Sequence, residues 1–150
     1  MYPIQKFNDQ YTEKVISFLR CCLPESGRKL DLDQKHKSYL DVQHCFDAFW
    51  IILDGEEIIG TAALKRMDEC RCELKSLYLY ERFQGRGLGR KLLETVIEEA
   101  VCSDYREMYL DTLSISRRAL SLYEKVGFVR TERYNENYDA DIFMVLKLGQ

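Results

Sequence analysis

The sequence predicts a mixed α/β fold in which one sheet carries helices on both faces. In the middle of the chain, apolar strands alternate with amphipathic helices, an order typical of parallel strands joined by crossover helices. Towards both ends, neighbouring strands follow one another without a helix between them, which is typical of antiparallel hairpins. The chain has 150 residues, of which 46% are hydrophobic. We therefore expect a single domain, residues 1–150, with one core.

The first part of the chain is predicted to begin with a short edge strand at residues 4–7. Apolar residues then recur at helical spacing from Tyr11 to Leu19, and Pro24 ends this predicted helix. Residues 27–32 are expected to form a loop. The spacing of apolar side chains over residues 32–40 predicts a second helix.

The next segment is predicted to be a hairpin followed by strands and a long helix. Residues 48–53 are apolar, Asp54-Gly55 is a strong turn signal, and residues 57–64 are expected to form the returning strand. Further along, an apolar stripe over residues 88–100 predicts an amphipathic helix with glutamates on its exposed face.

The last third is predicted to contain one more helix and two strands. The helix covers residues 117–126 and ends at Gly127, a residue that suits a left-handed C-cap. Residues 128–134 and 141–148 are expected to be the final two strands, joined by a polar loop.

Composition excludes several classes of function. The formal net charge is −3, so there is no broad basic face and we expect no nucleic acid as a partner. No apolar run is long enough to span a membrane, and the N-terminal residues lack signal-peptide character. The six cysteines form neither a C-x-x-C pair nor a zinc framework, so we expect reduced thiols, no metal and a cytoplasmic location.

The segment that carries chemistry is the glycine-rich turn at residues 84–90, Gln84-Gly85-Arg86-Gly87-Leu88-Gly89-Arg90. Alternate glycines permit positive φ and leave backbone N–H groups accessible to a ligand's oxygens. The helix that follows leaves its first N–H groups without intrahelical partners, and its dipole favours an anion. The arginines add positive charge. These features predict a phosphate site, in particular one for a pyrophosphate.

Two common phosphate motifs do not fit this turn. A dinucleotide fingerprint requires a glycine where Arg90 or Leu92 stands, and an ATP-type loop also requires glycine in place of Arg90. The pattern that fits is Q-x-x-G-x-G, made by Gln84, Gly87 and Gly89. Here the sequence resembles the GNAT superfamily of acyl-CoA-dependent N-acyltransferases.

Segments on both sides of the turn strengthen the resemblance. Residues 72–80 look like the central strand of that fold, and residues 107–113 look like the next, parallel strand. Residues 119–128 match the family's A-x-x-L-Y-x-x-x-G-F signature. The resemblance implies a mostly antiparallel sheet with a splayed parallel strand pair. It also implies acetyl-CoA as co-substrate and an amine as acceptor.

The resemblance also assigns site residues. It implies that the coenzyme is bound by the edge of the central strand, by the turn and, more weakly, by the serine that replaces a common family asparagine: Leu77, Tyr78, Leu79, Gln84, Gly85, Arg86, Gly87, Leu88, Gly89, Arg90 and Ser116. Capping of the helix that begins at Arg117 is the alternative role for Ser116.

Tyr123 is the predicted general acid, which would protonate the thiolate of coenzyme A as it leaves. A phenol with a pKa near 10 can donate a hydrogen bond to that sulfur and remain protonated at neutral pH. The alternative is that Tyr123 only fills the core. Glu73 is the predicted base that removes the proton of the acceptor amine, with an exposed ion pair to Lys75 as its alternative. Asp111 is a weaker candidate for the same role.

For the acceptor, the sequence predicts a chemical character and no particular molecule. Acidic and aromatic residues in the segments before residue 51 and after residue 135 would suit a cationic amine, although an ordinary acidic surface would look the same: Asp31, Asp33, Tyr39, Asp41, Phe49, Trp50, Glu136, Tyr138 and Asp139. A coenzyme-binding regulatory module without acyl transfer is the alternative to an active N-acetyltransferase. A homodimer is expected by analogy alone.

Overall fold

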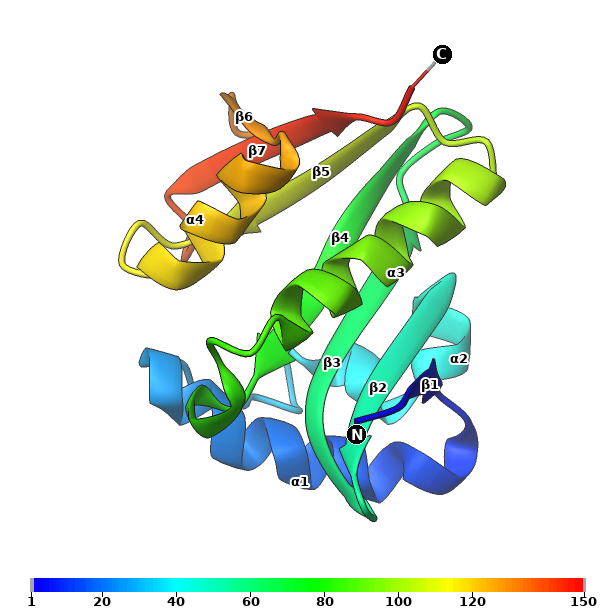
Figure 1. The fold of residues 1–150 in the computed structure, drawn as a ribbon, viewed down its shortest axis with the longest axis vertical. Coiled ribbons are helices and arrows are strands. Elements are labelled where there is room, and N and C mark those ends of the chain that lie inside the picture. Colours follow the sequence, from blue (N-terminus) through cyan, green and yellow to red (C-terminus); the bar gives the residue numbers. More distant parts are fainter. Residues whose placement is uncertain (1, 150) are drawn as a thin grey trace.

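The computed structural model describes residues 2–149, and over them the chain forms one seven-stranded sheet in the order β1-β2-β3-β4-β5-β7-β6 (Figure 1). Only β4 and β5 pair in parallel, and every other neighbouring pair is antiparallel. The strands are β1 (Ile4–Lys6), β2 (Ala48–Asp54), β3 (Glu57–Arg66), β4 (Arg71–Leu79), β5 (Glu107–Thr112), β6 (Val129–Thr131) and β7 (Ile142–Lys147). The predicted mixed sheet, mostly antiparallel with one parallel pair, is confirmed.

Helices cover both faces of this sheet. They are α1 (Thr12–Cys22), α2 (Val42–Cys45), α3 (Leu88–Cys102) and α4 (Arg117–Val126). Both α1 and α3 pack against β3, and Figure 1 shows α3 in front of β3 and β4 while β3 passes in front of α1. Residues 58–64 of β3 are buried without a break. A strand buried at every position has both faces covered, so the core continues on either side of the sheet.

The predicted helix over residues 32–40 is wrong. The chain there makes turns, a short 3-10 helix at Lys37–Leu40 and then α2. The Asp31 carboxylate accepts the N–H groups of Asp33 and Gln34, and the imidazole of His36 accepts the N–H of Asp31. Side chains that bind nearby backbone donors compete with helical hydrogen bonds, and here they prevail. The apolar spacing still marked a buried residue, because Tyr39 is in the core.

The sixth strand is shorter than the predicted range of 128–134. β6 ends at Thr131, and the chain then turns under the sheet edge. The guanidinium of Arg133 donates to the carbonyls of Asn137 and Ala140, while the hydroxyl of Tyr134 donates to Glu73. These side-chain bonds bend the segment away from β7 and bring the loop before β7 to the splayed strands.

Candidate functional site

The site is built on the gap between β4 and β5. Their parallel pairing is confined to residues 71–73 of β4 and 107–109 of β5. Beyond Glu73, β4 continues beside β3 and β5 continues beside β7. Residues 75–79 of β4 are only half-buried, whereas the preceding residues 72–74 are buried. The two strands therefore separate and leave one edge of β4 without a neighbouring strand.

A β-bulge in β4 shapes the floor of this gap. The register between β3 and β4 shifts at this point, and Ser76 has a φ of +57°. This is an unusual conformation for a residue with a Cβ, and bulges often re-aim side chains beside functional sites. Two contacts hold it: Thr61 Oγ1 donates to the Ser76 carbonyl at 2.6 Å, and the Tyr39 hydroxyl lies 2.5 Å from Ser76 Oγ.

The glycine-rich turn leads from the end of β4 into α3. Gly85 and Gly87 have φ values of +81° and +80°, and Gly87 is the N-cap of α3. Among residues 2–149, no backbone carbonyl accepts the N–H groups of residues 85–90. The Gln84 side chain donates to the Leu79 carbonyl at 3.1 Å and so fixes the turn against the strand. The turn therefore presents a group of free donors at a helix N-terminus, an arrangement suited to phosphate oxygens.

Helix α4 connects the turn to the gap. A Cβ at Gly85 would lie 3.3 Å from Arg118 Nη1, and one at Gly89 would lie 3.6 Å from Leu122 Cδ2. On the adjacent stripe of α4, Ala119 and Tyr123 line the gap. Residues four apart share a helix face, so one stripe of α4 touches the turn and its neighbour faces the gap. A ligand that extends from the turn to the gap would run along this helix.

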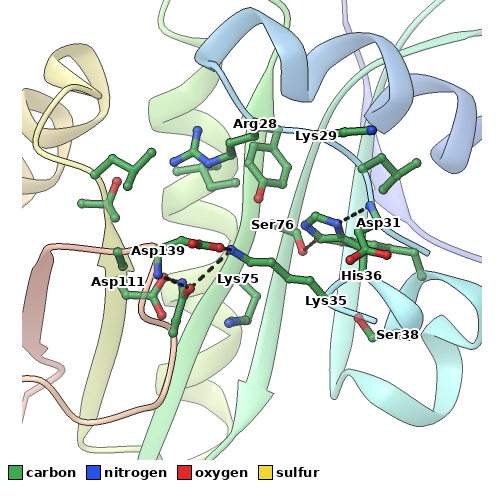
Figure 2. A pocket seen from close by; sticks show the side chains of 18 of the residues that line it. Arg28, Lys29, Asp31, Lys35, His36, Ser38, Lys75, Ser76, Asp111 and Asp139 are labelled. Atoms are coloured by element: carbon green, nitrogen blue, oxygen red, sulfur yellow. Dashed lines mark hydrogen bonds and ion pairs between the residues drawn. The ribbon is translucent and has the colours of Figure 1, made fainter. Parts of the chain in front are cut away.

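The gap opens into a cavity of about 1220 Å³. Its walls come from β4, β5, α4, residues 27–39 and the loop before β7 (Figure 2). A cavity of this size exceeds what a drug-sized ligand requires. It has room for the reacting end of a coenzyme together with a second substrate.

Tyr123 lies at the wall of this cavity with its ring buried. The ring packs edge-on against Phe128, with 5.7 Å between centroids. No buried polar side-chain atom lacks a partner among residues 2–149, and the Tyr123 hydroxyl makes no hydrogen bond there, so its oxygen is open to the cavity. Burial raises the pKa of the Tyr123 phenol well above 10.0, and the neighbouring Tyr78 raises it further. The phenol stays protonated at neutral pH, as a proton donor must.

Glu73 is buried just where β4 and β5 stop pairing. Its carboxylate accepts hydrogen bonds from the Tyr134 hydroxyl at 2.6 Å and from Asn135 Nδ2 at 3.3 Å, and Lys75 Nζ lies 3.6 Å away. Burial, and then the charge of Glu73, raise the pKa of Tyr134. Glu73 does not line the cavity.

Asp111 on β5 is the carboxylate that reaches the cavity beside the strand gap. Its two oxygens accept from Asn135 Nδ2 at 2.6 Å and from Asn137 Nδ2 at 3.0 Å. Asn135 therefore joins Asp111 and Glu73 in one hydrogen-bonded cluster. This cluster fixes the position of the Asp111 side chain and keeps its charge at the wall of the cavity.

His36 lies on the opposite wall and is buried. Its Nδ1 accepts the Asp31 N–H at 2.8 Å, so in the neutral ring the hydrogen is on Nε2. Burial lowers the pKa of His36 below 6.5, and the charge of Lys35 lowers it further. The ring is neutral at neutral pH, and its Nδ1 acts as a hydrogen-bond acceptor.

Only some of the residues predicted to bind the acceptor line the same cavity. Asp31, Asp33, Tyr39 and Asp139 line the cavity, and Glu136 and Tyr138 line a smaller adjoining depression. The remaining three, Asp41, Phe49 and Trp50, lie outside both. No sequence pattern marked Lys35, whose Nζ lies 2.5 Å from Asp139 Oδ2 and 3.3 Å from Asn137 Oδ1. This contact bridges the loop before β7 to the segment before α2.

The predicted coenzyme residues divide into two neighbouring groups. Leu77, Tyr78 and Ser116 line the cavity with Tyr123. Leu79 and residues 84–90 lie outside it, at the end of β4. Ser116 is at the N-cap position of α4, but its side chain makes no capping hydrogen bond. The side chains of Arg86 and Arg90 bind the Tyr2 hydroxyl and Glu94.

Residues 2–149 contain no group of three or more His, Cys, Asp or Glu side chains placed to hold a metal ion. Within that same range, no helix has the length and apolar character needed to cross a membrane.

Comparison with known proteins decides the family. The model of the acetyltransferase (GNAT) family matches residues 12–128. The chain belongs to this family. It is 31% identical over 108 residues to N-acetyltransferase 8B of Homo sapiens, an alignment that covers 69% of this chain and 47% of that protein. The chain thus spans about half the length of this relative.

Solved structures agree with the GNAT fold. A GNAT acetyltransferase from Staphylococcus aureus Mu50 superposes with a TM-score of 0.90 at 23% identity, covering 99% of this chain and all of that one. A putative acetyltransferase from Salmonella typhimurium, solved with its cofactor acetyl-CoA, gives a TM-score of 0.76 at 20% identity and covers 99% and 95% of the two chains. At these identities the likeness establishes the fold.

Proposed function

We propose that this GNAT protein transfers the acetyl group of acetyl-CoA to a primary amine within a ternary complex. The main support for the proposal is that three features suited to bind the coenzyme follow one another along α4. These are the free N–H groups of residues 85–90, the unpaired edge of β4 and the Tyr123 hydroxyl at the cavity wall. The acetyl-CoA-bound relative of the same fold supports the choice of coenzyme.

The coenzyme is proposed to lie along this path. The N–H groups of residues 85–90 bind the diphosphate, and Gln84 acts through Leu79 to hold the turn in place. The pantetheine arm follows the free edge of β4 at Leu77 and Tyr78, with Ser116 on the opposite side. Arg118, which lies over Gly85, adds positive charge beside the phosphates. The thioester then reaches the gap between β4 and β5.

The chemical step is a direct attack of the amine on the thioester carbon. The C–N bond forms, the C–S bond breaks, the amine loses one proton and the sulfur gains one. Tyr123 is proposed to donate the proton to sulfur, because its raised pKa keeps the phenol protonated and its oxygen is open to the cavity. Glu73 remains our proposed base, acting through water because its carboxylate lies outside the cavity.

The remaining expectations from the sequence concern domain organisation, cellular location and oligomeric state, and we propose them as well. We infer that residues 1–150 act as one acetyltransferase domain. The six cysteines are all free thiols, which supports a reducing, cytoplasmic location. A homodimer stays a prediction by analogy.

The experiment that tests this function measures release of free thiol from acetyl-CoA in the presence of a panel of amines. We expect at least one amine to accelerate thiol release, with the acetylated amine detected by mass spectrometry. Thermal stabilisation by coenzyme A without turnover on any amine would favour the coenzyme-binding module instead. Equal stabilisation by ATP would contradict the proposed diphosphate and pantetheine path.

A further inference from the structure

The charge of the cavity wall restricts which amine can enter it. Within the described residues the lining includes four carboxylates and six basic side chains, namely Arg20, Arg28, Lys29, Lys35, Lys65 and Lys75. His36 on the same wall is buried and its pKa is lowered, so it adds no charge at neutral pH. A wall with more cations than carboxylates does not favour a simple polycationic amine.

Contacts within the protein reduce the effect of the carboxylates further. Asp139 is paired with Lys35 at 2.5 Å, and the two charges offset each other. One oxygen of Asp31 accepts two backbone N–H groups at 3.2 Å in an exposed turn. The Asp111 carboxylate belongs to β5 and lies beside the strand gap. Its hydrogen-bond partners are the neutral amides of Asn135 and Asn137, which do not offset its negative charge.

Arg28 is the corresponding cation on the facing wall. It follows the 3-10 helix Leu23–Ser26 and its guanidinium lies 5.9 Å from the centre of the Tyr78 ring, with one Nη1 bond to Ser26 Oγ at 2.6 Å. Among residues 2–149 it forms no ion pair with a carboxylate. A half-buried guanidinium with donors to spare is suited to bind a carboxylate in a forked geometry.

Arg28 and Asp111 face the same reacting region from opposite sides. Figure 2 shows Arg28 at one side of the cavity and Asp111 and Asp139 at another, with the ammonium end of Lys35 beside Asp139. Both charges act on the phenols of Tyr78 and Tyr123, where Arg28 lowers and Asp111 raises the pKa. The two groups therefore form a pair of opposite charges around the proposed proton donor.

We propose that the acceptor is a free amino acid, with its carboxylate bound by Arg28 and its ammonium group by Asp111. This inference rests on the proposed acetyl transfer and names the substrate class for it. The paired charges orient the zwitterion so that its nitrogen lies at the β5 side of the gap, next to the thioester. The ammonium group gives up its proton to water, which passes it to Glu73, before the nitrogen attacks. Asp111 serves as a positioning residue that holds the nitrogen in place.

The test uses acceptors that differ only in the carboxylate. Each amino acid is compared with its carboxamide and with the amine that lacks the carboxyl group, and thiol release from acetyl-CoA gives kcat and KM separately. We expect kcat/KM to be at least about tenfold higher for the amino acid, since a charge-assisted hydrogen bond is lost in the other two. Arg28→Gln is expected to raise KM for the amino acid by about tenfold or more and to raise KM for the decarboxylated amine by much less.

Arg130→Gln is the matched control, because it removes the same charge from exposed β6. An equal KM increase in this control would overturn the inference, since it would reveal a general effect of net charge. Equal rates for amino acid, amide and amine would overturn it while the proposed acetyl transfer stands. Preferred acetylation of peptide N-termini, which lack a free α-carboxylate, would do the same.

If no acceptor releases thiol, a binding measurement can still test the amino-acid site separately from the proposed acetyl transfer. Calorimetric titration of amino acids into the protein saturated with coenzyme A reports the zwitterion site without turnover. Binding that disappears in Arg28→Gln and persists in Arg130→Gln would support the site although the acetyl transfer fails. Absence of binding to the unmodified protein would overturn the inference.

Discussion

Replacing Tyr123 by phenylalanine removes one oxygen atom from the cavity wall and leaves the ring in place. The ring contact with Phe128 at 5.7 Å does not involve that oxygen, and the hydroxyl has no hydrogen-bond partner among residues 2–149. No buried polar group loses a partner, so the change in unfolding free energy is expected to stay within about 0.5 kcal/mol. For a chain of this size this corresponds to a melting temperature within about 2 °C of the original.

The effect on turnover should be much larger than the effect on stability. General acid catalysis contributes about 10² to 10⁴ in rate, which corresponds to about 2.7–5.4 kcal/mol of transition-state stabilisation. Tyr123→Phe is therefore expected to lower kcat by about 10²-fold or more. The dissociation constant of acetyl-CoA should not change, because the diphosphate is bound at residues 85–90.

The assay combines steady-state thiol release, acetyl-CoA titration and thermal melting of the same preparation. Tyr105→Phe is the control away from the site, since Tyr105 precedes β5 at the end remote from the strand gap and its hydroxyl donates to Asp47 Oδ2 at 3.4 Å. An unchanged kcat in Tyr123→Phe would refute the role of the phenol as proton donor. A melting temperature lowered by many degrees together with the lost activity would point to a structural role instead.

Three further outcomes follow from the structure. Burial lowers the pKa of His36, so its contribution to stability is present above pH 6.5 and is lost as the pH falls below that value. His36→Asn, which keeps an acceptor for the backbone, should flatten the decline in melting temperature between about pH 6.5 and 5, and an unaltered decline would contradict this reasoning. Glu73→Gln should change the acidic limb of the pH–rate profile, and an unaltered limb would exclude Glu73 as the base. Gly60→Ala would place a Cβ 2.7 Å from a side-chain methyl and 2.9 Å from a backbone oxygen; a cost of about 1–3 kcal/mol is expected from chemical denaturation, and an unaltered midpoint would contradict it.

Local sequence signals predicted the parts of the site that depend on backbone conformation. The glycines of the turn at residues 84–90 have the positive φ values that their pattern indicated, at Gly85 and Gly87. Tyr123 lines the cavity on one stripe of α4, whereas its helical spacing alone favoured a role in the core, and the family resemblance assigned it to the site. For the glycines, the residue type itself restricts the backbone, so one sequence is enough.

Features that depend on distant contacts were not predictable in this way. Nothing in the sequence marks Ser76 as a bulge, because Thr61 and Tyr39 hold it from other parts of the chain. The predicted helix at residues 32–40 is absent for a local reason, because Asp31 and His36 form hydrogen bonds with the nearby backbone. The spacing of apolar residues did not indicate these bonds. Side-chain contacts across the fold determine the bulge, and side-chain bonds to the nearby backbone determine the turns after Asp31.

The charges of the cavity wall also depend on contacts between distant residues, so the sequence alone did not predict which of them are paired. The acidic residues of the segments at its rim suggested a cationic acceptor from the sequence alone. In the structure Lys35 pairs with Asp139, whereas Arg28 has no carboxylate partner among residues 2–149. Which charges are offset is decided by contacts between residues about a hundred positions apart.

A crystal structure of the protein grown with acetyl-CoA would locate both the diphosphate and the sulfur. We expect the diphosphate within about 3 Å of the N–H groups of residues 85–90 and the sulfur within hydrogen-bonding distance of the Tyr123 hydroxyl. A diphosphate bound away from this turn, or a thioester sulfur directed away from the gap between β4 and β5, would contradict it.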